Sequence, residues 1–96
     1  MNIRRVMVLH HPHRPEAAEY AQVVTKRLAE AHVATVDGDD TTSPVELVLS
    51  LGGDGTMLAG AEKARERDVP LLGINFGHMG FLTDVDADQL DRVIDA

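Results

Sequence analysis

Three glycines surround a single acid in the segment LGGDGT, residues 51–56. An apolar run, VELVLS, precedes this segment, and a helix-like stretch, MLAGAEKARERD, follows it. A helix that begins at the carboxyl end of a strand presents backbone N–H groups that lack internal partners and carry partial positive charge. Gly52, Gly53 and Gly55 would let an anion approach this backbone closely, because no side chain stands in the way and positive φ is allowed. The segment therefore predicts an anion-binding loop.

The acid in this loop needs a role, because a carboxylate repels a phosphate unless a cation or a hydroxyl lies between them. Asp54 could accept the proton of a hydroxyl that attacks a phosphoryl group, or hold a Mg²⁺ ion that bridges phosphates. The alternative is a tight turn in which Asp54 or Thr56 only caps the following helix. A Walker A loop would need a lysine after Gly55, and the Rossmann fingerprint would need a small residue where Leu58 stands. Neither of these phosphate-binding motifs is present.

Alternating strand and helix patterns surround the loop. The apolar run 45–51 is interrupted only by Glu46 and Ser50, which is typical of a strand covered on both faces. Pro15 suits the first turn of a helix, and Pro70 ends one. The hydrophobic periods predict strands at 3–9, 33–36, 45–51 and 70–76 and helices at 15–33, from 57 to near 68, and after Asp86. We expect an α/β fold of three layers, a mostly parallel, Rossmann-like sheet with helices on both faces.

The composition limits the possible functions. Ninety-six residues with 44% hydrophobic content suit one small domain. A formal net charge of −7 argues against nucleic acid and membrane surfaces as partners. No apolar stretch approaches the roughly 18 to 20 residues of a membrane span, and the start lacks a signal peptide, so we expect a soluble, cytoplasmic protein. The absence of cysteine excludes disulfides and thiolate zinc sites.

Two polar clusters have ordinary interpretations. His10, His11 and His13 could suggest a metal site, but no acid stands nearby at ligand spacing, so we interpret them as a surface turn and predict no metal there. Asp37, Asp39 and Asp40 resemble half of a calcium loop that lacks its glycine and closing glutamate, and we interpret them as a solvated loop.

A second motif, PLLGINFGHMGFLTD, begins at Pro70. Together with LGGDGTMLAGA it resembles the amino-terminal domain of NAD kinases. The Gly-Gly-Asp-Gly-Thr element also occurs in diacylglycerol and sphingosine kinases, and phosphofructokinases have a close relative of it. The Gly-Ile-Asn-x-Gly-x-x-Gly-Phe-Leu-Thr element separates NAD kinases from these enzymes. The similarity extends over most of the chain.

The resemblance implies phosphoryl transfer from ATP, or in some members polyphosphate, to the 2′-hydroxyl of the adenosine ribose of NAD. It implies Mg²⁺ with the donor and no permanently bound cofactor. Asp54 matches the proton acceptor of the family and, with Gly55, a dinucleotide contact. Asn75 belongs to the second motif and would shape the adjoining wall. The implied nucleotide site comprises Gly52, Gly53, Asp54, Gly55, Thr56, Leu58, Asn75, His78 and Phe81.

The chain departs from the family pattern in two respects. Many bacterial members carry a basic residue that helps to bind the ligand at the position of Ala59. Members also continue into a β-rich domain that completes the NAD pocket, so we expect residues 1–96 to be the amino-terminal domain of a parent enzyme, weakly active or inactive alone. The resemblance further implies a homodimer or homotetramer. Two alternatives stay open: a lipid kinase of the diacylglycerol or sphingosine type, and a non-catalytic nucleotide-binding domain.

Overall fold

Four parallel strands form a single sheet in the part of the chain that the structure, a computed structural model, describes, residues 3–11 and 15–74. The strand order is β2-β1-β3-β4, so the chain begins near the middle of the sheet and builds outward in both directions. In chain order the elements are β1 (Arg5–His10), α1 (Pro15–Glu30), β2 (Ala34–Val36), β3 (Leu47–Leu51), α2 (Asp54–Arg67) and β4 (Leu71–Ile74).

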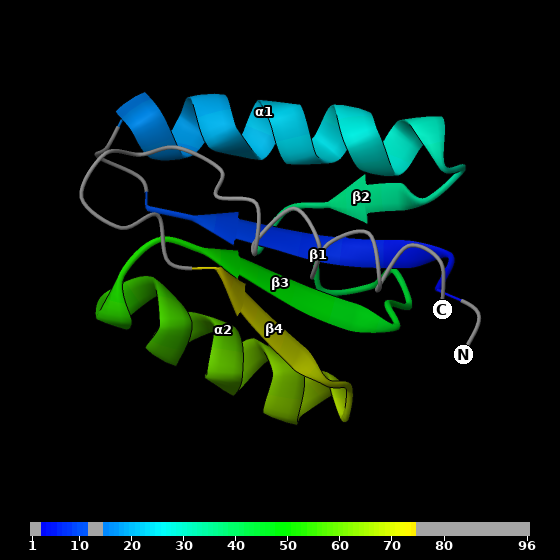
Figure 1. Ribbon diagram of the computed structural model, residues 1–96. Coiled ribbons are helices and arrows are strands. Elements are labelled where there is room, and N and C mark those ends of the chain that lie inside the picture. Colours follow the sequence, from blue (N-terminus) through cyan, green and yellow to red (C-terminus); the bar gives the residue numbers. More distant parts are fainter. Residues whose placement is uncertain (1–2, 12–14, 75–96) are drawn as a thin grey trace.

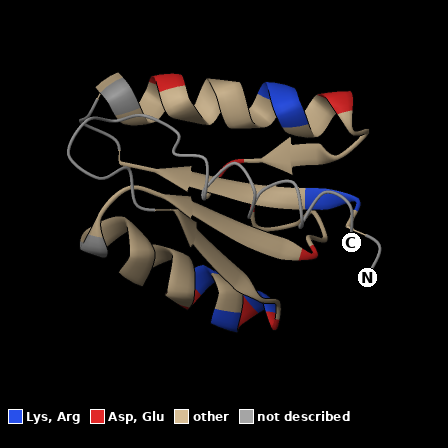
Figure 2. Cartoon of the chain, viewed as in Figure 1, with Lys and Arg blue, Asp and Glu red and all other residues tan. Residues whose placement is uncertain are grey.

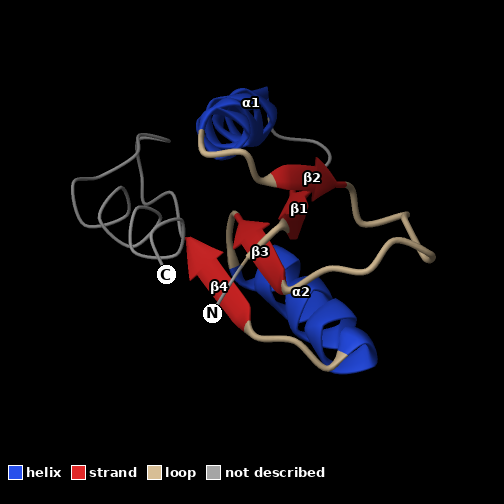
Figure 3. Ribbon diagram, turned by 90° about the vertical axis from the view of Figure 1, so that its right-hand side faces the viewer, coloured by secondary structure: helices blue, strands red, loops and turns tan. Residues whose placement is uncertain are grey.

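The two helices cover opposite faces of the sheet (Figures 1 and 3). Alternate side chains of β1 mark the two faces, because successive residues of a strand point in opposite directions. Val6 and Val8 pack in the cluster that includes α1, whereas Met7 packs in the cluster that includes Ala64 of α2. The predicted three-layer α/β fold is confirmed.

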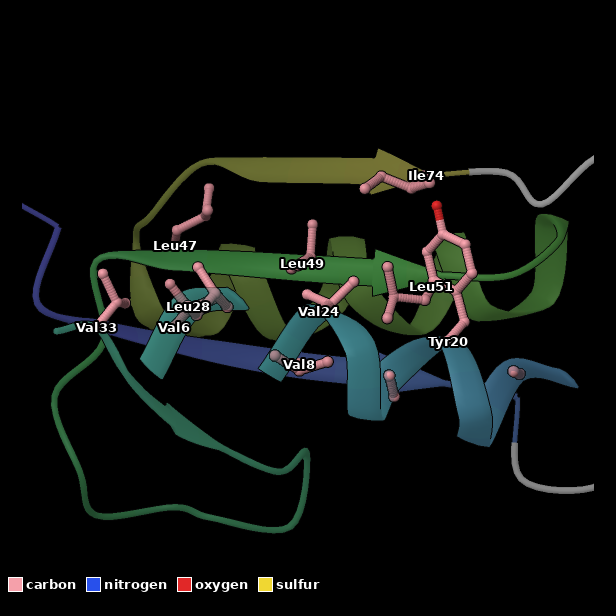
Figure 4. Close-up of a cluster of buried hydrophobic side chains, with 12 residues drawn as sticks. Val6, Val8, Tyr20, Val24, Leu28, Val33, Leu47, Leu49, Leu51 and Ile74 are labelled. Carbon is pink, nitrogen blue, oxygen red and sulfur yellow. The ribbon is translucent and has the colours of Figure 1, made fainter. Parts of the chain in front are cut away.

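α1 packs along one face through an apolar stripe at helical spacing (Figure 4). The helical spacing of apolar residues in this segment predicts a stripe of Ala17, Ala21, Val24, Leu28 and Ala31. The first four are buried, whereas Ala31 follows the end of the helix and is partly buried. Tyr20, which the pattern did not include, is also buried in this cluster. The helix ends at Glu30, before the predicted end at residue 33.

β3 is the most deeply buried strand, since all five of its residues are buried. Leu47, Leu49 and Leu51 face α1, whereas Val48 packs on the side of α2. This arrangement confirms the prediction of a strand covered on both faces. The carboxyl end of β3 leads directly into the glycine motif.

α2 begins earlier than the sequence predicted. The periodicity indicated a start near Met57, but the first helical residue is Asp54, so the motif itself forms the first turn. The buried face consists of the small residues Thr56, Gly60 and Ala64. A Cβ added at Gly60 would lie 3.0 Å from a side-chain carbon of Leu71 and 3.0 Å from Cβ of Ser50, so glycine lets α2 lie close to the sheet.

The carboxyl end of α2 was predicted well. The helix ends at Arg67, and Asp68 takes a left-handed conformation with φ 55°. Its N–H donates to the carbonyl groups of Ala64 and Arg65. The strand predicted over 70–76 is observed at Leu71–Ile74, whereas the helix predicted after Asp86 lies outside the described residues.

Candidate phosphate-binding site

The glycine motif lies at the edge of the sheet where β1, β3 and β4 end (Figure 1). His10 is paired with Leu51 across the ladder between β1 and β3. On the other side, the N–H of Gly52 donates to the carbonyl of Ile74 at 3.0 Å. The structure thus brings Gly73–Ile74, which belong to the second sequence motif, beside the first. Ligands of open α/β sheets bind at this type of edge.

Gly52 is required by the fold. Its φ is +147°, a conformation that residues with a side chain rarely adopt. A Cβ at this position would also lie 2.9 Å from Oγ1 of Thr56. Of the three predicted glycines, this is the one with positive φ.

Gly53 and Gly55 are glycines for a different reason. A Cβ built on either residue would meet no described atom within 4 Å, so the space beside this backbone is open. Gly53 is the N-cap of α2 and makes no side-chain cap hydrogen bond, whereas its carbonyl accepts the first helical bond from Met57 at 3.0 Å. The N–H groups of the first turn, residues 54–56, precede that bond and have no partner within the helix. They present donors and partial positive charge to the open space.

The other predicted residues of the loop occupy contrasting positions. The alternative in which Asp54 or Thr56 caps the helix is wrong, because both lie within the first turn and the cap is Gly53. Thr56 is only 8% exposed, but Leu58 is 71% exposed. Asp54 starts the helix, and its side chain is outside the described part of the structure. The contact of Leu58 with a nucleotide stays a prediction.

A pocket of about 280 Å³ opens beside this first turn. It is lined from two elements, by Leu9, His10 and His11 at the end of β1 and by Gly55, Thr56 and Ala59 of α2. The sequence placed the two histidines on a surface turn and did not connect them with the glycine motif. The pairing of β1 with β3 places the two histidines beside the glycine motif. This pairing joins segments far apart in the sequence, so no local pattern predicts it.

Among the described residues, charged side chains are sparse at this edge (Figure 2). None of the described residues that line the pocket is Lys or Arg. The basic residues of α2 instead lie toward its other end, at Lys63, Arg65 and Arg67. Within the described ranges, no three His, Asp or Glu side chains form a group that could hold a metal ion.

The acidic loop at 37–44 is a surface loop that hydrogen bonds hold in place, several of them to Asp40. Its carboxylate accepts bonds from the backbone N–H groups of Ser43 and Thr42 at 2.8 and 3.0 Å and from the Ser43 hydroxyl at 2.9 Å. These bonds, first those from Ser43, hold the pKa of Asp40 below its ordinary value, and Arg67 adds a smaller effect. Arg67 also donates to the carbonyl groups of Ser43 and Asp40, both at 2.6 Å.

A larger hollow of about 540 Å³ lies along α1 and β2. It is lined mainly by side chains such as Gln22, Thr25 and Lys26, on the opposite side of the sheet from α2. It touches the end of β1 only at His10 and includes none of the residues of the glycine motif. The smaller pocket is therefore the candidate site.

Three further predicted residues, Asn75, His78 and Phe81, lie outside the described residues.

Comparison with known proteins identifies the family of the chain. Residues 39–96, which include both sequence motifs, match the family model of the ATP-NAD kinase N-terminal domain. The chain belongs to the NAD kinase family. NAD kinase 2 of Streptomyces coelicolor is 38% identical over 113 residues, which cover 97% of this chain and 38% of the relative. NAD kinase of Corynebacterium diphtheriae is 37% identical over 114 residues, covering 95% of this chain and 36% of the relative.

One further relative matches only part of this chain, but with higher sequence identity. NAD kinase of Rhodococcus erythropolis is 51% identical over 57 residues, which cover 59% of this chain. This NAD kinase family chain spans well under half of the length of the relatives named here. None of the helices in the described ranges has the length and apolarity needed to cross a membrane.

Proposed function

We propose that this chain provides the phosphate-binding part of an active site that phosphorylates the 2′-hydroxyl of the adenosine ribose of NAD, giving NADP. The phosphoryl donor is ATP or inorganic polyphosphate. Membership of the NAD kinase family supports the reaction class. The substrates and the activity belong to this proposal, because the chain spans only 38% of NAD kinase 2 of S. coelicolor.

The observation that carries the proposal is the open backbone at the start of α2. N–H groups of the first turn that have no partner within the helix face space that no side chain of Gly53 or Gly55 occupies. Phosphoryl transfer depends mainly on alignment and charge neutralisation, and fixed backbone donors provide both. Gly52 supports this role because its positive φ sets the direction in which the chain enters the helix.

Asp54 is the residue that we assign to proton transfer. It stands between the two open glycines, at the first position of the helix. In the proposed reaction its carboxylate accepts the proton of the attacking 2′-hydroxyl, while the phosphoryl group moves from the donor to that oxygen. Leu58, Asn75, His78 and Phe81 are proposed contacts of the nucleotide.

Mg²⁺ enters the proposal together with the donor. The described residues contain no group of three side chains suited to a metal, and Mg²⁺ needs none, because it commonly binds through one or two carboxylates plus substrate phosphates and keeps several waters. Asp54 is the carboxylate that would hold it. The ion would supply neutralisation of the phosphate charge.

The partners and the domain organisation are also proposed. We propose that residues 1–96 act as the amino-terminal α/β domain and that a β-rich part completes the NAD pocket in an oligomeric enzyme. The coverage of the relatives supports this view, since their sequences are more than twice as long as the matched region.

The test is an assay of the complete gene product with ATP or polyphosphate as donor and Mg²⁺ present. NAD and diacylglycerol are offered as acceptors in parallel reactions. We expect NADP to form and the lipid to stay unphosphorylated. Phosphorylation of the lipid without NADP would support a lipid kinase instead, and the absence of both products would favour a non-catalytic nucleotide-binding domain.

A further inference from the structure

A glycine of β4 admits a side chain from the start of α2. Gly73 lies next to the last residue of β4, and a Cβ built on it would fall on the Sδ and Cε atoms of Met57. The end of the Met57 side chain therefore occupies the space that any larger residue at position 73 would need. A glycine inside a strand is typical of such a close approach. Methionine suits the other side of the contact, because its flexible thioether fills irregular gaps.

The contact lies where the start of α2 meets the end of β4. Gly60, about one turn after Met57 in the helix, faces the side chain of Leu71, which precedes Gly73 in the strand. Helix and strand thus run in opposite directions (Figure 1). Leu71 packs on the side of α2, and the alternation of strand side chains places Gly73 on that same side.

Met57 follows directly after the open first turn of α2. Its N–H donates the first helical hydrogen bond, to the carbonyl of Gly53 at 3.0 Å. Residues 54–56, whose N–H groups have no partner within the helix, immediately precede it. The position of the Met57 backbone therefore sets where these N–H groups point. Its half-buried side chain connects that backbone to β4 at Gly73.

A backbone hydrogen bond connects the same two segments just before the helix. The N–H of Gly52 donates to the carbonyl of Ile74 at 3.0 Å, and Ile74 is the neighbour of Gly73. The glycine loop is thus attached to β4 at two adjacent positions, by its backbone before the first turn and by the Met57 side chain after it. Residues 53–56 lie between these two attachments.

We infer that Met57 is a positioning residue of the proposed reaction. By packing on Gly73, its side chain fixes the open first turn of α2 against the end of β4. That turn is proposed to bind the donor phosphates, and Asn75, two residues after Gly73, is a proposed contact of the nucleotide. The distance between the two segments therefore governs how the donor is aligned with the acceptor. This inference rests on the proposed function, because it assigns a residue to the alignment of that reaction.

The first test is a double-mutant cycle on kcat for NADP formation by the complete gene product at saturating NAD and ATP. Gly73→Ala should lower kcat about tenfold, because the added methyl group displaces Met57 and the turn attached to it. Met57→Ala should lower kcat by a similar factor, since the turn loses its attachment. Added to Met57→Ala, Gly73→Ala should cause little further loss, because the atoms that it would displace are gone. The inference is overturned if Gly73→Ala lowers kcat by the same factor in both backgrounds.

Two further variants separate positioning from a general loss of stability. Val69 is partly buried on the same side of the sheet, just beyond the other end of α2. Val69→Ala should therefore weaken the fold, as measured by urea unfolding, but leave kcat unchanged. Met57→Leu keeps an apolar side chain of similar volume and should retain most of kcat. If Val69→Ala lowers kcat as much as Met57→Ala does, the loss reflects stability alone and the inference is wrong.

Amide hydrogen exchange tests the same contact without catalysis. In the complete gene product, Met57→Ala should speed exchange at residues 57 and 58 about tenfold, because the first bonds of α2 open more often, whereas Val69→Ala should not. Unchanged exchange in Met57→Ala would overturn the inference. This measurement also distinguishes the inference from the proposed function. If the unmodified protein forms no NADP, the proposed function fails, and exchange still reports whether Met57 holds the first turn.

Discussion

Gly52 and Gly55 stand three residues apart in one motif but are glycines for different physical reasons. Gly52 has positive φ and no room for a Cβ beside Thr56, so the folded chain itself requires it. Gly55 has ordinary backbone and open space, so the fold does not require it. What Gly55 keeps free is the approach of a ligand to the helix start.

This difference predicts opposite effects on stability. Gly52→Ala should lower the free energy of unfolding by about 1 to 3 kcal/mol, because alanine is strained at positive φ. Gly55→Ala should leave the free energy unchanged or raise it by up to about 1 kcal/mol, since alanine favours the helix. Urea unfolding of both variants measures the effect. Equal destabilisation by the two substitutions would contradict an open space beside Gly55.

At the residue scale, the sequence revealed the glycines but not their partners. A cluster of glycines around Asp54 is a local pattern, and the prediction of an anion-binding loop needs nothing beyond it. The histidines belong to a different strand, and their position depends on the register in which His10 pairs with Leu51. That register is fixed by the assembled sheet and its core, so residues 10 and 11 were interpreted as an ordinary turn.

The elements show the same division between local and tertiary information. The apolar run at β3 and the apolar stripe of α1 were predictable, because a regular spacing of apolar residues, or an unbroken run of them, indicates which residues are buried. The start of α2 was not predictable, since glycine is a poor helix former and the glycines of the motif interrupt the helical pattern in the first turn. The buried face of α2 was also not predictable from the sequence, because close contact with the sheet requires the small residues Gly60 and Ala64 rather than large apolar residues.

Arg67 links α2 to the acidic loop at 37–44 through two backbone carbonyl groups. Arg67→Ala should therefore lower the free energy of unfolding by about 1 to 3 kcal/mol, because two charge-assisted bonds are lost. Arg65→Ala is the matched control, an exposed arginine on the same turn. Urea unfolding should show a change below about 0.5 kcal/mol for the control. Equal effects of the two substitutions would argue against the link.

Asp40 gives this loop a dependence on pH. Its pKa in the folded protein lies below the ordinary value, mainly because Ser43 donates to the carboxylate. The ionised group therefore contributes stability above its unfolded pKa, and this contribution is lost as pH falls through the lower, folded pKa. Asp40→Asn should lower the melting temperature at pH 7, and its difference from the unmodified protein should shrink as the pH is lowered below about 4. A difference that is the same at pH 7 and pH 3 would contradict this account.

On the scale of the whole molecule, the proposal assigns one half of an active site to the described residues. The open backbone of α2 lies at the edge of a sheet whose next segment, after Ile74, continues the second motif. The relatives are more than twice as long as the matched region. The parts that would hold NAD are proposed to lie in the remainder of such an enzyme.

This division predicts that the 96-residue chain alone forms NADP below the limit of detection, whereas the complete gene product forms it readily. The physical reason is that phosphoryl transfer requires both substrates to be aligned, and one half of the site can position only one of them. Coupled assays for NADP at equal protein concentration provide the comparison. Circular dichroism of the 96-residue chain is needed alongside, to establish that it is folded. Equal rates for a folded 96-residue chain would place the whole site within it.

The most direct test of the central claim is kcat for NADP formation by Asp54→Asn in the complete gene product. The substitution keeps the size of the side chain but removes its ability to accept a proton, so kcat should fall by about 100-fold or more. Asp68→Asn is the control at the other end of α2, where the left-handed φ of 55° suits asparagine. A large loss in Asp54→Asn with full activity in Asp68→Asn is the predicted result. An unchanged kcat in a folded Asp54→Asn enzyme would contradict the assignment of this loop as the centre of the reaction.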